Sequence, residues 1–362
     1  MKKILVAGSG HIGSLIAILL NQVKDYQVIV IDKDFEHSKL NKFIDILPQV
    51  NVRTLDVSDK KILISVMKEY HIDAVISCLP FYLNEHIATC AKDVEAHYFD
   101  LTEDVQTTQK IKSLAEQAKT AFVPQCGIAP GFINLLTHHL MGAFDHCKDV
   151  KLRVGGLPKY IDNTLKYGLT WSLEGLINQY CNPCPAIEKG VLVMKEALDE
   201  IEELVFDGCS YEAFHTSGGV GHLVTHALGK VENLNYKTIR YPGHCEKMRF
   251  LIKDLNLNQD RKLLFQILQK SLPQVDDDVL LLYASVSGLI QNEFEEKHYF
   301  KKILPTEING HKWTAMQTAT ASSVCSAVDL VLSHTGAIHG FISHAWFHFD
   351  EFVHNRFACC FI

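Results

Sequence analysis

The sequence predicts an α/β protein: a Rossmann fold, which is a doubly wound parallel sheet, with an inserted α+β substrate domain and a C-terminal helix that returns to the Rossmann domain. Three observations support this fold class. A βα rhythm runs to about residue 125, strands and helices are mixed after it, and a long apolar helical pattern covers 312–332. We therefore predict a Rossmann domain over 1–125, a substrate and dimerisation domain over 126–311, and a helical segment over 312–362 that packs back on the first domain.

The composition limits the classes of partner. With 362 residues, the chain is longer than one average domain, which favours two. Its net charge of −7 argues against a nucleic-acid surface or a polybasic membrane contact. No apolar run reaches the roughly 18 residues of a membrane span. We expect neither a nucleic-acid nor a membrane partner.

The cysteines indicate a reducing compartment. There are 11 of them, an odd number, and most lie inside apolar patterns, which is typical of reduced core thiols and predicts a cytoplasmic location. Cys181 and Cys184 have C-x-x-C spacing, but no second pair lies at zinc-finger distance. We therefore predict no metal site.

The first element of the chain is a glycine loop between a strand and a helix. The apolar run 3–7 leads into Gly8, Gly10 and Gly13, and a helical pattern follows. Gly8 permits the turn off the strand, Gly10 lets backbone approach a pyrophosphate, and Gly13 lets the helix lie close on the sheet. The helix N-terminus then faces the phosphate charge. The alternative is a glycine turn with nothing bound.

An acid ends the second strand of this unit. Asp32 follows the apolar run 28–31 and lies 19 residues past Gly13, where a carboxylate can accept hydrogen bonds from both ribose hydroxyls. Its charge would repel a 2′-phosphate, so we expect NAD to be preferred over NADP. Lys33 next to it would soften that preference.

The first half continues with strands and helices in alternation. We predict strands over 50–55, 74–79, 97–100 and 121–124, and helices over 59–70 (with Ser58 as N-cap), 84–92 and 105–118. The carboxyl ends of these strands face a bound cofactor. The residues assigned to the cofactor are Gly8, Gly10, His11, Ile12, Gly13, Asp32, Lys33, Asp56, Val57, Cys78, Leu79 and Pro80.

The second half mixes longer strands with helices. We predict strands over 150–154, 169–173, 212–216, 237–241 and 279–291, and helices over 132–141, 245–255, 261–268 and 312–332. Residues 174–180 start a helix or a turn, and 191–203 shows no single clean period. In the tail, phenylalanines and Trp346 alternate with histidines from His339 on. A core-packing or dimer helix explains the aromatic spacing, and metal binding by the histidines is the alternative.

Five strings of the second half resemble one family. They occur in one order: Cys126-Gly-Ile-Ala-Pro-Gly131, Gly155-Gly-Leu-Pro158, Thr170-Trp-Ser-Leu-Glu-Gly175, Thr216-Ser-Gly-Gly219 and Lys237-Thr-Ile-Arg-Tyr-Pro-Gly-His244. The chain resembles the saccharopine dehydrogenase family, in its saccharopine reductase and lysine 6-dehydrogenase branch, from residue 1 to about 330. The resemblance implies a Rossmann domain, an inserted substrate domain, a returning helix, and oxidation or reductive formation of a C–N bond on an amino acid with NAD or NADP. The tail after about His339 departs from the family pattern.

An amino-acid substrate needs a cation for its carboxylate. Arg240, beside the Pro-Gly turn, is our candidate because a guanidinium binds a carboxylate through two parallel hydrogen bonds; a surface ion pair is the alternative. Trp171 is a candidate pocket wall, with core packing as the simpler interpretation. Ser217 and Gly218 belong to a glycine turn that would present backbone amides to a carboxylate, or would only turn the chain.

Hydride transfer at an amine carbon also needs proton transfer, because the amine reacts in its neutral form and the imine is formed or hydrolysed with a proton shift. The groups that could do this are Asp100, Cys126, Lys166, Tyr167, Glu174 and His244, of which Asp100, Cys126 and His244 are our catalytic candidates. The alternative for Asp100 is capping of the next helix, and the alternative for His244 is capping of its own helix.

The sequence therefore predicts an NAD(P)-dependent oxidoreductase that acts on a C–N bond of a saccharopine- or lysine-like amino acid, as a homodimer. Two alternatives stay open. One is a carboxynorspermidine-type imine reductase of polyamine synthesis. The other is a non-catalytic Rossmann protein that senses a nucleotide.

Overall fold

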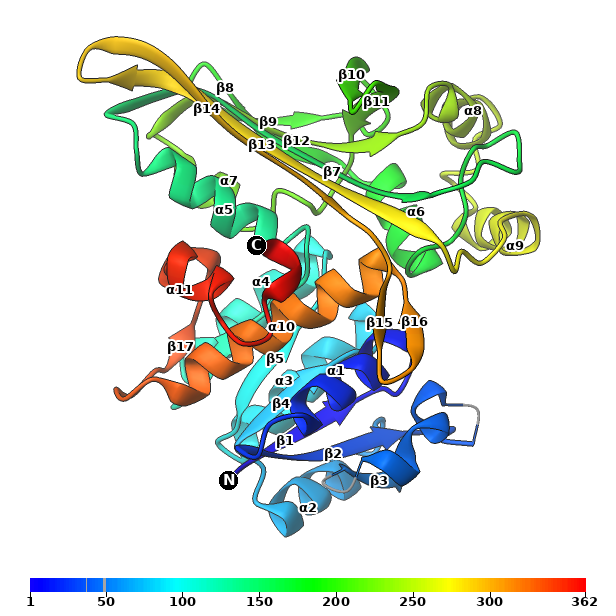
Figure 1. Cartoon of the computed structure of the whole chain (residues 1–362), viewed down its shortest axis with the longest axis vertical. Coiled ribbons are helices and arrows are strands. Elements are labelled where there is room, and N and C mark those ends of the chain that lie inside the picture. Colours follow the sequence, from blue (N-terminus) through cyan, green and yellow to red (C-terminus); the bar gives the residue numbers. More distant parts are fainter. Residues whose placement is uncertain (37, 48–49) are drawn as a thin grey trace. The chain divides into compact units, whose positions relative to one another are not determined.

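The computed structural model describes residues 1–36, 38–47 and 50–362, which divide into two units. Unit 1 comprises residues 1–132 and 319–362, and unit 2 comprises residues 133–318 (Figure 1). The chain thus leaves unit 1, forms unit 2, and returns. The predicted fold class, a Rossmann unit with an inserted α+β unit and a returning helix, is confirmed.

Unit 1 is built on a parallel sheet with strand order β17-β6-β5-β4-β1-β2-β3. Its strands are β1 (Lys2–Ala7), β2 (Tyr26–Asp32), β3 (Val50–Thr54), β4 (Ala74–Ser77), β5 (His97–Asp100), β6 (Ala121–Val123) and β17 (Gly340–Phe341). The central strands are apolar throughout because both faces of the sheet are covered: Ile4–Ala7 and Val28–Ile31 are fully buried. The strand order reverses between β1 and β4, which is where such sheets bind ligands.

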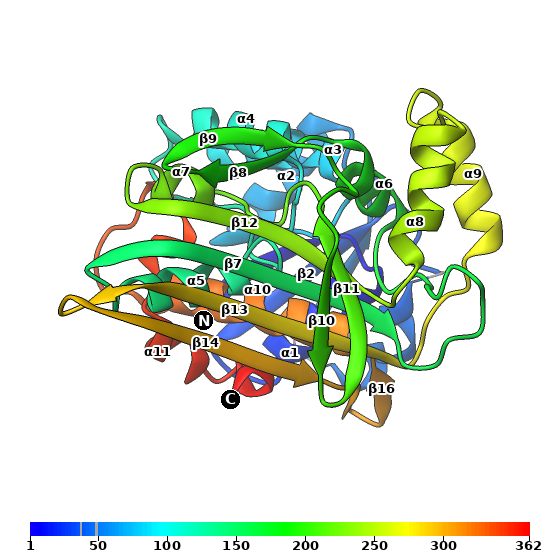
Figure 2. The same ribbon diagram turned by 90° about the horizontal axis from the view of Figure 1, so that it is seen from above.

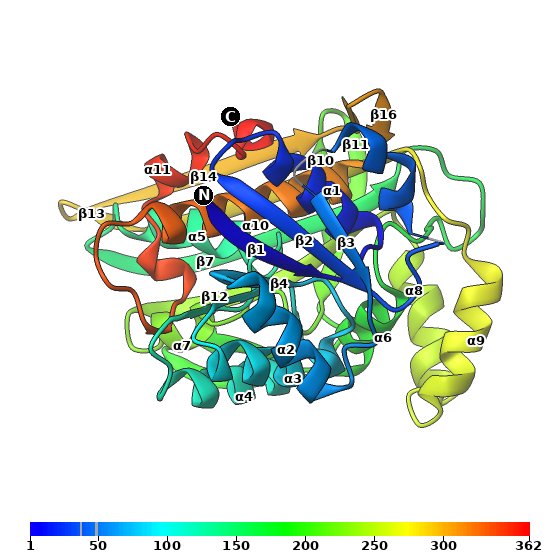
Figure 3. The same ribbon diagram turned by 90° about the horizontal axis from the view of Figure 1, so that it is seen from below.

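Helices cover both faces of this sheet. They are α1 (His11–Asn21), α2 (Lys60–Tyr70), α3 (Phe81–Asp93), α4 (Val105–Ala115), α10 (Ala315–Ser333) and α11 (Phe349–Val353). Figures 1 and 3 show α1 and α10 on one face of the sheet and α2, α3 and α4 on the other. The second group packs its apolar stripes on Leu5, Ile29 and Val75 of the strands.

Two details of unit 1 differ from the sequence prediction. Asp59, and not Ser58, is the N-cap of α2: its Oδ1 accepts hydrogen bonds from the amides of Lys61 (2.9 Å) and Ile62 (3.1 Å). The sheet also gains β17 from the tail, which pairs in parallel with β6.

Unit 2 is a mixed sheet with helices. The path is β10-β11-β12-β7-β13-β14, and β8 joins β12 to β9. Its strands are β7 (His146–Pro158), β8 (Cys184–Glu188), β9 (Val191–Lys195), β10 (Glu202–Phe206), β11 (Cys209–His215), β12 (Val231–Arg240), β13 (Asp278–Ile290) and β14 (Glu293–Ile303). Figure 2 shows β7, β12, β13 and β14 side by side, with β10 and β11 crossing over them. Phe206 of β10 accordingly stacks on Phe300 of β14, with ring centroids 4.6 Å apart.

The helices of unit 2 lie around this sheet. They are α5 (Phe132–Met141), α6 (Leu173–Cys181), α7 (Leu223–Ala227), α8 (His244–Arg249), which continues as a π-helical turn over Phe250–Asp254, and α9 (Arg261–Ser271). A short hairpin, β15 (Thr306–Ile308) with β16 (His311–Trp313), precedes α10.

The prediction of a strand over 169–173 is wrong. Leu169 makes one isolated bridge with Gln274, and Ser172 is already the N-cap of α6, since its hydroxyl accepts a hydrogen bond from the amide of Gly175 (3.2 Å). The segment 191–203, which lacked a clean period, contains β9 and the start of β10.

The returning helix begins later than predicted, at Ala315, because residues before it form the hairpin. Both oxygens of buried Asp278 accept backbone hydrogen bonds at its start, from Ala315 (2.5 Å) and Met316 (3.0 Å). A carboxylate there satisfies amides that have no helical partner.

The tail does not form the continuous helix that the aromatic spacing suggested. It contains β17, a 3-10 turn over His344–Trp346, the short helix α11, and a second 3-10 turn over Cys359–Phe361. The aromatic rings are nevertheless in the core of unit 1: Phe361 stacks on Phe132 with ring centroids 3.9 Å apart, and Phe352 and Phe357 are buried.

Candidate functional site

The glycine loop of unit 1 has a geometry that other residues cannot adopt. Gly8 has φ +99°, and a Cβ on it would lie 3.0 Å from the carbonyl oxygen of Cys78. A Cβ on Gly13 would lie 1.9 Å from the carbonyl oxygen of Gly8. Gly10, by contrast, has open space where its Cβ would be, and it begins α1 without a side-chain cap. The loop therefore fits a phosphate group approaching the helix N-terminus.

Asp32 lies at the end of β2 beside this loop. Its Oδ2 accepts hydrogen bonds from the amide (2.6 Å) and hydroxyl (2.9 Å) of Ser9, and its Oδ1 accepts one from the amide of Asp34 (3.1 Å). The hydroxyl of Ser38 donates to the carbonyl oxygen of Ser9 (2.9 Å). Asp32 therefore holds the loop in place and keeps its negative charge at the edge where a ribose would lie.

The other residues assigned to a cofactor lie at the ends of neighbouring strands. Cys78, Leu79 and Pro80 follow β4, which pairs with β1, and Leu79 lies against Gly8. Asp56 and Val57 follow β3, where the amide of Ser58 donates to Asp56 and lowers the pKa of that carboxyl. His11 and Ile12 form the first turn of α1, and Lys33 is exposed after β2.

Asp100 is fully buried at the end of β5. Its Oδ1 accepts hydrogen bonds from the amides of Thr102 (2.9 Å) and Gln125 (3.1 Å), and its Oδ2 accepts one from the hydroxyl of Tyr98 (2.9 Å). Burial raises the pKa of this carboxyl to about 6, although the three donors oppose the rise. Asp100 thus titrates close to neutral pH while it ties the β5 and β6 loops together.

Cys126 lies in the loop that follows β6. Its thiol is buried and donates to the carbonyl oxygen of Val123 (2.9 Å). Burial raises the pKa of the thiol well above its usual value, and the nearby Asp100 carboxyl adds to the rise. The thiol therefore stays protonated at neutral pH and is a poor nucleophile.

Arg240 ends β12 in unit 2 and is 2% exposed. Its Nε donates to the hydroxyl of Tyr180 (2.9 Å) and its Nη1 to the carbonyl oxygen of Ile239 (2.8 Å). The guanidinium carbon lies 4.7 Å from the ring centroid of Tyr167. Within residues 1–36, 38–47 and 50–362, no carboxylate forms an ion pair with Arg240. A buried charge without a counter-ion is costly, so this arrangement indicates a ligand anion.

An unpaired polar group belongs to the ring that lies against this guanidinium. The hydroxyl of Tyr167 is buried and has no hydrogen-bond partner among the described residues. Buried hydroxyls normally find a partner. We call Arg240 and Tyr167 the candidate anion subsite.

His244 lies behind Arg240. It is buried, its Nε2 lies 3.0 Å from the Tyr180 hydroxyl, and its Nδ1 lies 2.8 Å from the carbonyl oxygen of Leu165. Burial, helped by the charge of Arg240, lowers the pKa of His244 to about 3. The imidazole is therefore neutral at any physiological pH.

The remaining candidates of unit 2 have contacts within the fold. The hydroxyl of Ser217 donates to the carbonyl oxygen of Pro183 (2.9 Å), and Gly218 has φ +89° in a turn. Trp171 is half-buried against the apolar core below α6. Lys166 donates to the carbonyl oxygen of Pro242 (2.9 Å), and Glu174 accepts from the N-cap hydroxyl of Ser172 (3.1 Å).

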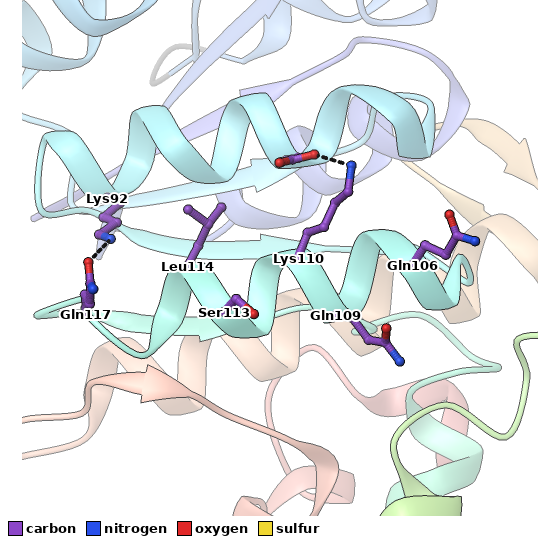
Figure 4. Close-up of a pocket in the computed structure, with 8 residues that line it drawn as sticks. Lys92, Gln106, Gln109, Lys110, Ser113, Leu114 and Gln117 are labelled. Carbon is purple, nitrogen blue, oxygen red and sulfur yellow. Dashed lines mark hydrogen bonds and ion pairs between the residues drawn. The ribbon is translucent and has the colours of Figure 1, made fainter.

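A groove of about 520 Å³ lies elsewhere, between α3 and α4 (Figure 4). Its lining is Glu85, Lys92, Gln106, Gln109, Lys110, Ser113, Leu114 and Gln117. Lys110 pairs with Glu85 at 2.7 Å and Lys92 donates to Gln117 at 3.3 Å. These long polar side chains are paired at a surface, and none of the predicted site residues lies among them.

No group of three or more histidine, cysteine, aspartate or glutamate residues that could hold a metal ion is found in the described ranges. The same ranges contain no helix that is long and apolar enough to cross a membrane.

Sequence reasoning missed two residues of these sites. Ser9, which holds Asp32, lies inside the glycine motif, and its place there could have indicated this role. Tyr180 gave no signal, since it lies far from Arg240 in the sequence and an aromatic residue on a helix is usually core.

A Rossmann sheet with a glycine loop and a terminal acid is the arrangement of a dinucleotide-binding protein. Family comparison gives the particular family. The saccharopine dehydrogenase NADP binding domain matches residues 4–123, and the saccharopine dehydrogenase C-terminal domain matches residues 127–346. The chain belongs to the saccharopine dehydrogenase family.

Its relatives are distant. It is 23% identical over 334 residues to a saccharopine dehydrogenase [NADP(+), L-glutamate-forming] of Schizosaccharomyces pombe, covering 87% of this chain and 72% of that one. It is 23% identical over 267 residues to the mitochondrial alpha-aminoadipic semialdehyde synthase of Rattus norvegicus, covering 70% of this chain. The chain spans 28% of the length of that rat protein and 36% of its Bos taurus counterpart.

Two solved structures share the fold. The apo saccharopine dehydrogenase (L-Glu forming) of Saccharomyces cerevisiae matches with a TM-score of 0.77 at 15% identity, covering 95% of this chain and 94% of that one. The homospermidine synthase of Legionella pneumophila in complex with NAD matches with a TM-score of 0.64 at 10% identity, covering 97% of this chain and 88% of that one.

Proposed function

We propose that this chain is an NAD(P)-dependent oxidoreductase that acts on a C–N bond of an amino acid, with a saccharopine- or lysine-like substrate. The observation that carries the proposal is Arg240, a buried guanidinium with no counter-ion in the described part of the chain. Of its five N–H donors, two are bonded within the protein, which leaves three for a ligand. A substrate carboxylate matches this geometry and charge.

The surroundings of Arg240 also favour a carboxylate over a free diamine. The neighbours that act on its charge are the tyrosines 167, 180 and 236, and none of them is a carboxylate. A polyamine would need acidic partners for its ammonium groups, and Arg240 would repel them. A homospermidine-type reaction is therefore disfavoured, whereas a carboxynorspermidine-type imine reduction, which keeps one carboxylate, stays the second candidate.

The glycine loop and Asp32 are the residues that would hold the dinucleotide, which when bound supplies a hydride acceptor or donor at C4 of its nicotinamide. The amides at the start of α1 would bind the pyrophosphate, and Asp32 the ribose hydroxyls. We propose that NAD is preferred, because the Asp32 charge opposes a 2′-phosphate. The matching family domain is described as NADP binding and the S. pombe relative as NADP-dependent, so this preference is a point on which the chain would differ from them.

Among the three catalytic candidates, the acid–base properties favour Asp100. With a pKa of about 6, it exchanges a proton near neutral pH, whereas Cys126 stays protonated and His244 stays neutral. We propose Asp100 as the group that accepts or returns a proton when the imine is formed or hydrolysed.

A turnover screen tests the function. Nicotinamide absorbance at 340 nm is followed in both directions at high enzyme concentration, with amino acids for oxidation and with amine–aldehyde pairs, with and without a carboxylate, for reduction. Turnover of carboxylate-bearing substrates alone supports the proposal. Turnover of a carboxylate-free diamine pair would contradict it, and no turnover with any substrate would favour the nucleotide-sensing alternative.

The cofactor preference is measured separately. We expect the dissociation constant of NADH, from its fluorescence on binding, to be lower than that of NADPH by about tenfold or more, since one close charge contact is worth more than 1 kcal/mol. Asp32→Ser should reduce the difference. Equal or tighter NADPH binding by the unaltered chain would show that Lys33 or another cation binds the phosphate.

The homodimer and the cytoplasmic location remain predictions. Light scattering after size-exclusion chromatography tests the first: a mass near twice the chain mass of 40.8 kDa supports a dimer.

A further inference from the structure

The proton positions around Arg240 follow from hydrogen-bond chemistry. A guanidinium only donates, so the Tyr180 hydroxyl must accept from Nε of Arg240 at 2.9 Å. That hydroxyl has one hydrogen, and the other group within reach is Nε2 of His244 at 3.0 Å. Tyr180 therefore donates to His244, and Nε2 of His244 carries no hydrogen.

The second nitrogen of His244 completes the chain. A neutral imidazole without a hydrogen on Nε2 carries it on Nδ1, where the carbonyl oxygen of Leu165 lies 2.8 Å away. The order is Arg240 to Tyr180 to His244 to Leu165, with one donor and one acceptor at every step. A second proton on His244 would place two hydrogens between His244 and Tyr180, which breaks the chain. The charges nearest to His244, Arg240 and Lys247, oppose that proton as well.

This chain of hydrogen bonds holds the guanidinium in place without neutralising its charge. A carboxylate in place of Tyr180 would also hold Nε, but it would cancel the charge and compete with a ligand carboxylate. Tyr180 and His244 are 1% exposed, and the rings of Tyr167 and Tyr180 lie 4.7 and 5.9 Å from the guanidinium carbon. Neutral groups thus hold one edge of the Arg240 guanidinium, and its other three N–H groups remain for a ligand.

We propose that Tyr180 and His244 are positioning residues, which hold Arg240 as a pre-oriented, uncompensated cation for one carboxylate of the ligand. The inference rests on the proposed function for the identity of that ligand as an amino acid, but the geometry requires only a carboxylate. His244 accordingly acts through Tyr180 and takes no part in proton transfer.

The test measures binding and does not depend on turnover. The probe is glutarate, a dicarboxylate, titrated into the full chain by calorimetry, and 1,5-diaminopentane is the probe of opposite charge and similar length. We expect glutarate to bind and the diamine not to bind. Tyr180→Phe should weaken glutarate binding about tenfold, because a hydrogen bond to a charged group is worth about 1.5 kcal/mol and the freed guanidinium edge can rotate.

His244 is tested with two variants. His244→Gln keeps an acceptor for the Tyr180 hydroxyl, whereas His244→Leu removes it, so the affinity for glutarate should fall in the order wild type, Gln, Leu. The matched control is Tyr241→Phe, which removes a tyrosine hydroxyl bonded to the Pro158 carbonyl oxygen (2.9 Å) and should leave glutarate affinity unchanged. Thermal melts show whether each variant folds, and the Gln variant is used if Leu does not.

The outcomes separate this inference from the proposed function. If Arg240→Lys weakens glutarate binding while Tyr180→Phe and both His244 variants bind like wild type, the positioning role is wrong and the carboxylate anchor stands. If neither Arg240→Lys nor Tyr180→Phe changes binding, both are wrong. A histidine NMR signal that titrates between pH 5 and 8 in wild type and is absent from His244→Gln would also overturn the inference.

Discussion

At the scale of single residues, Arg240 combines a charge with a fixed orientation, and these two properties respond differently to substitution. Arg240→Lys keeps the charge but loses the planar fork, so we expect kcat/KM for a carboxylate-bearing substrate to fall by roughly tenfold or more, and Arg240→Ala to lower it further. The dissociation constant of the cofactor should hardly change, because the glycine loop and Asp32 belong to the other unit. Wild-type kinetics in both variants would mean that another residue holds the carboxylate.

Asp100 makes the free energy of unfolding depend on pH. Its pKa is about 6 in the folded protein and about 4 when unfolded, so the unfolded chain loses its proton first as pH rises. The folded state then binds more protons, and the contribution of Asp100 to stability is greatest below pH 4, falls between pH 4 and 6, and is constant above pH 6. The total loss is about 3 kcal/mol, since one unit of pKa corresponds to about 1.4 kcal/mol.

Asp100→Asn should therefore stabilise the protein at pH 7.5. The amide oxygen can still accept from the Thr102 and Gln125 amides, and no charge needs to be buried. We expect the free energy of unfolding, from urea titrations, to rise by up to about 3 kcal/mol at pH 7.5 and to stay unchanged at pH 4, with loss of turnover if Asp100 carries the proton. If the stability of Asp100→Asn relative to wild type is lower at pH 7.5 than at pH 4, the three hydrogen-bond donors favour the ionised carboxylate.

Some of these positions could be predicted from sequence and others could not. The glycines and Asp32 lie within one βαβ unit, where residue spacing fixes their place at the carboxyl edge of the sheet. The role of His244 could not be predicted, because its pKa depends on burial and on the charge of Arg240, and its ring contacts Tyr180. Tyr180 is 60 residues away from Arg240 in the sequence, and only the folded sheet brings the two together.

At the scale of elements, polar contacts centred on one mostly buried carboxylate fasten the tail to the Rossmann sheet. Asp329 of α10 accepts hydrogen bonds from the hydroxyl of Tyr26, from Asn355 (2.7 Å) and from Arg356 (2.6 Å). Arg356 also binds Asp25 (2.5 Å). Burial raises the pKa of the Tyr26 hydroxyl, and Asp329 adds to the rise. Strand β2, helix α10 and the segment after α11 thus share one carboxylate.

Asp329→Ala should be strongly destabilising, because it leaves the three donors without an acceptor. We expect a loss of about 2–4 kcal/mol in the free energy of unfolding, measured by urea titration. The matched control is Glu85→Ala, which breaks the exposed pair with Lys110 and should have no measurable effect. Equal effects of the two changes would contradict a fastening role for Asp329.

The elements themselves were predicted unevenly, for physical reasons. Strand β5 and helix α5 have the bounds that the sequence indicated, because their apolar pattern and their flanking residues agree. Strand β14 was missed: its residues are charged and mostly exposed, so it is a strand only because β13 pairs with it along its whole length. The aromatic residues of the tail have a helical spacing, yet most of the tail is turns and short elements, and its rings pack into the core of unit 1.

At the scale of the whole molecule, unit 1 is made from two distant pieces of chain. Residues 319–362 complete a unit whose sheet is formed mainly by residues before 132. Ser323 of α10 donates to the carbonyl oxygen of Gly127 (2.9 Å), and Val324 and Val328 are fully buried. The sheet face that α10 covers would otherwise be apolar surface in water.

A chain that ends at residue 311 should therefore fail to form a stable unit 1. We expect it to be insoluble, or to show a lower melting temperature by circular dichroism and no NADH binding by fluorescence. A chain that ends at residue 333 is the graded control: it keeps α10 but loses Arg356 and the aromatic tail, so it should fold with a melting temperature between the other two. A soluble chain ending at residue 311 with wild-type NADH affinity would show that residues 1–132 form the cofactor unit without the returning helix.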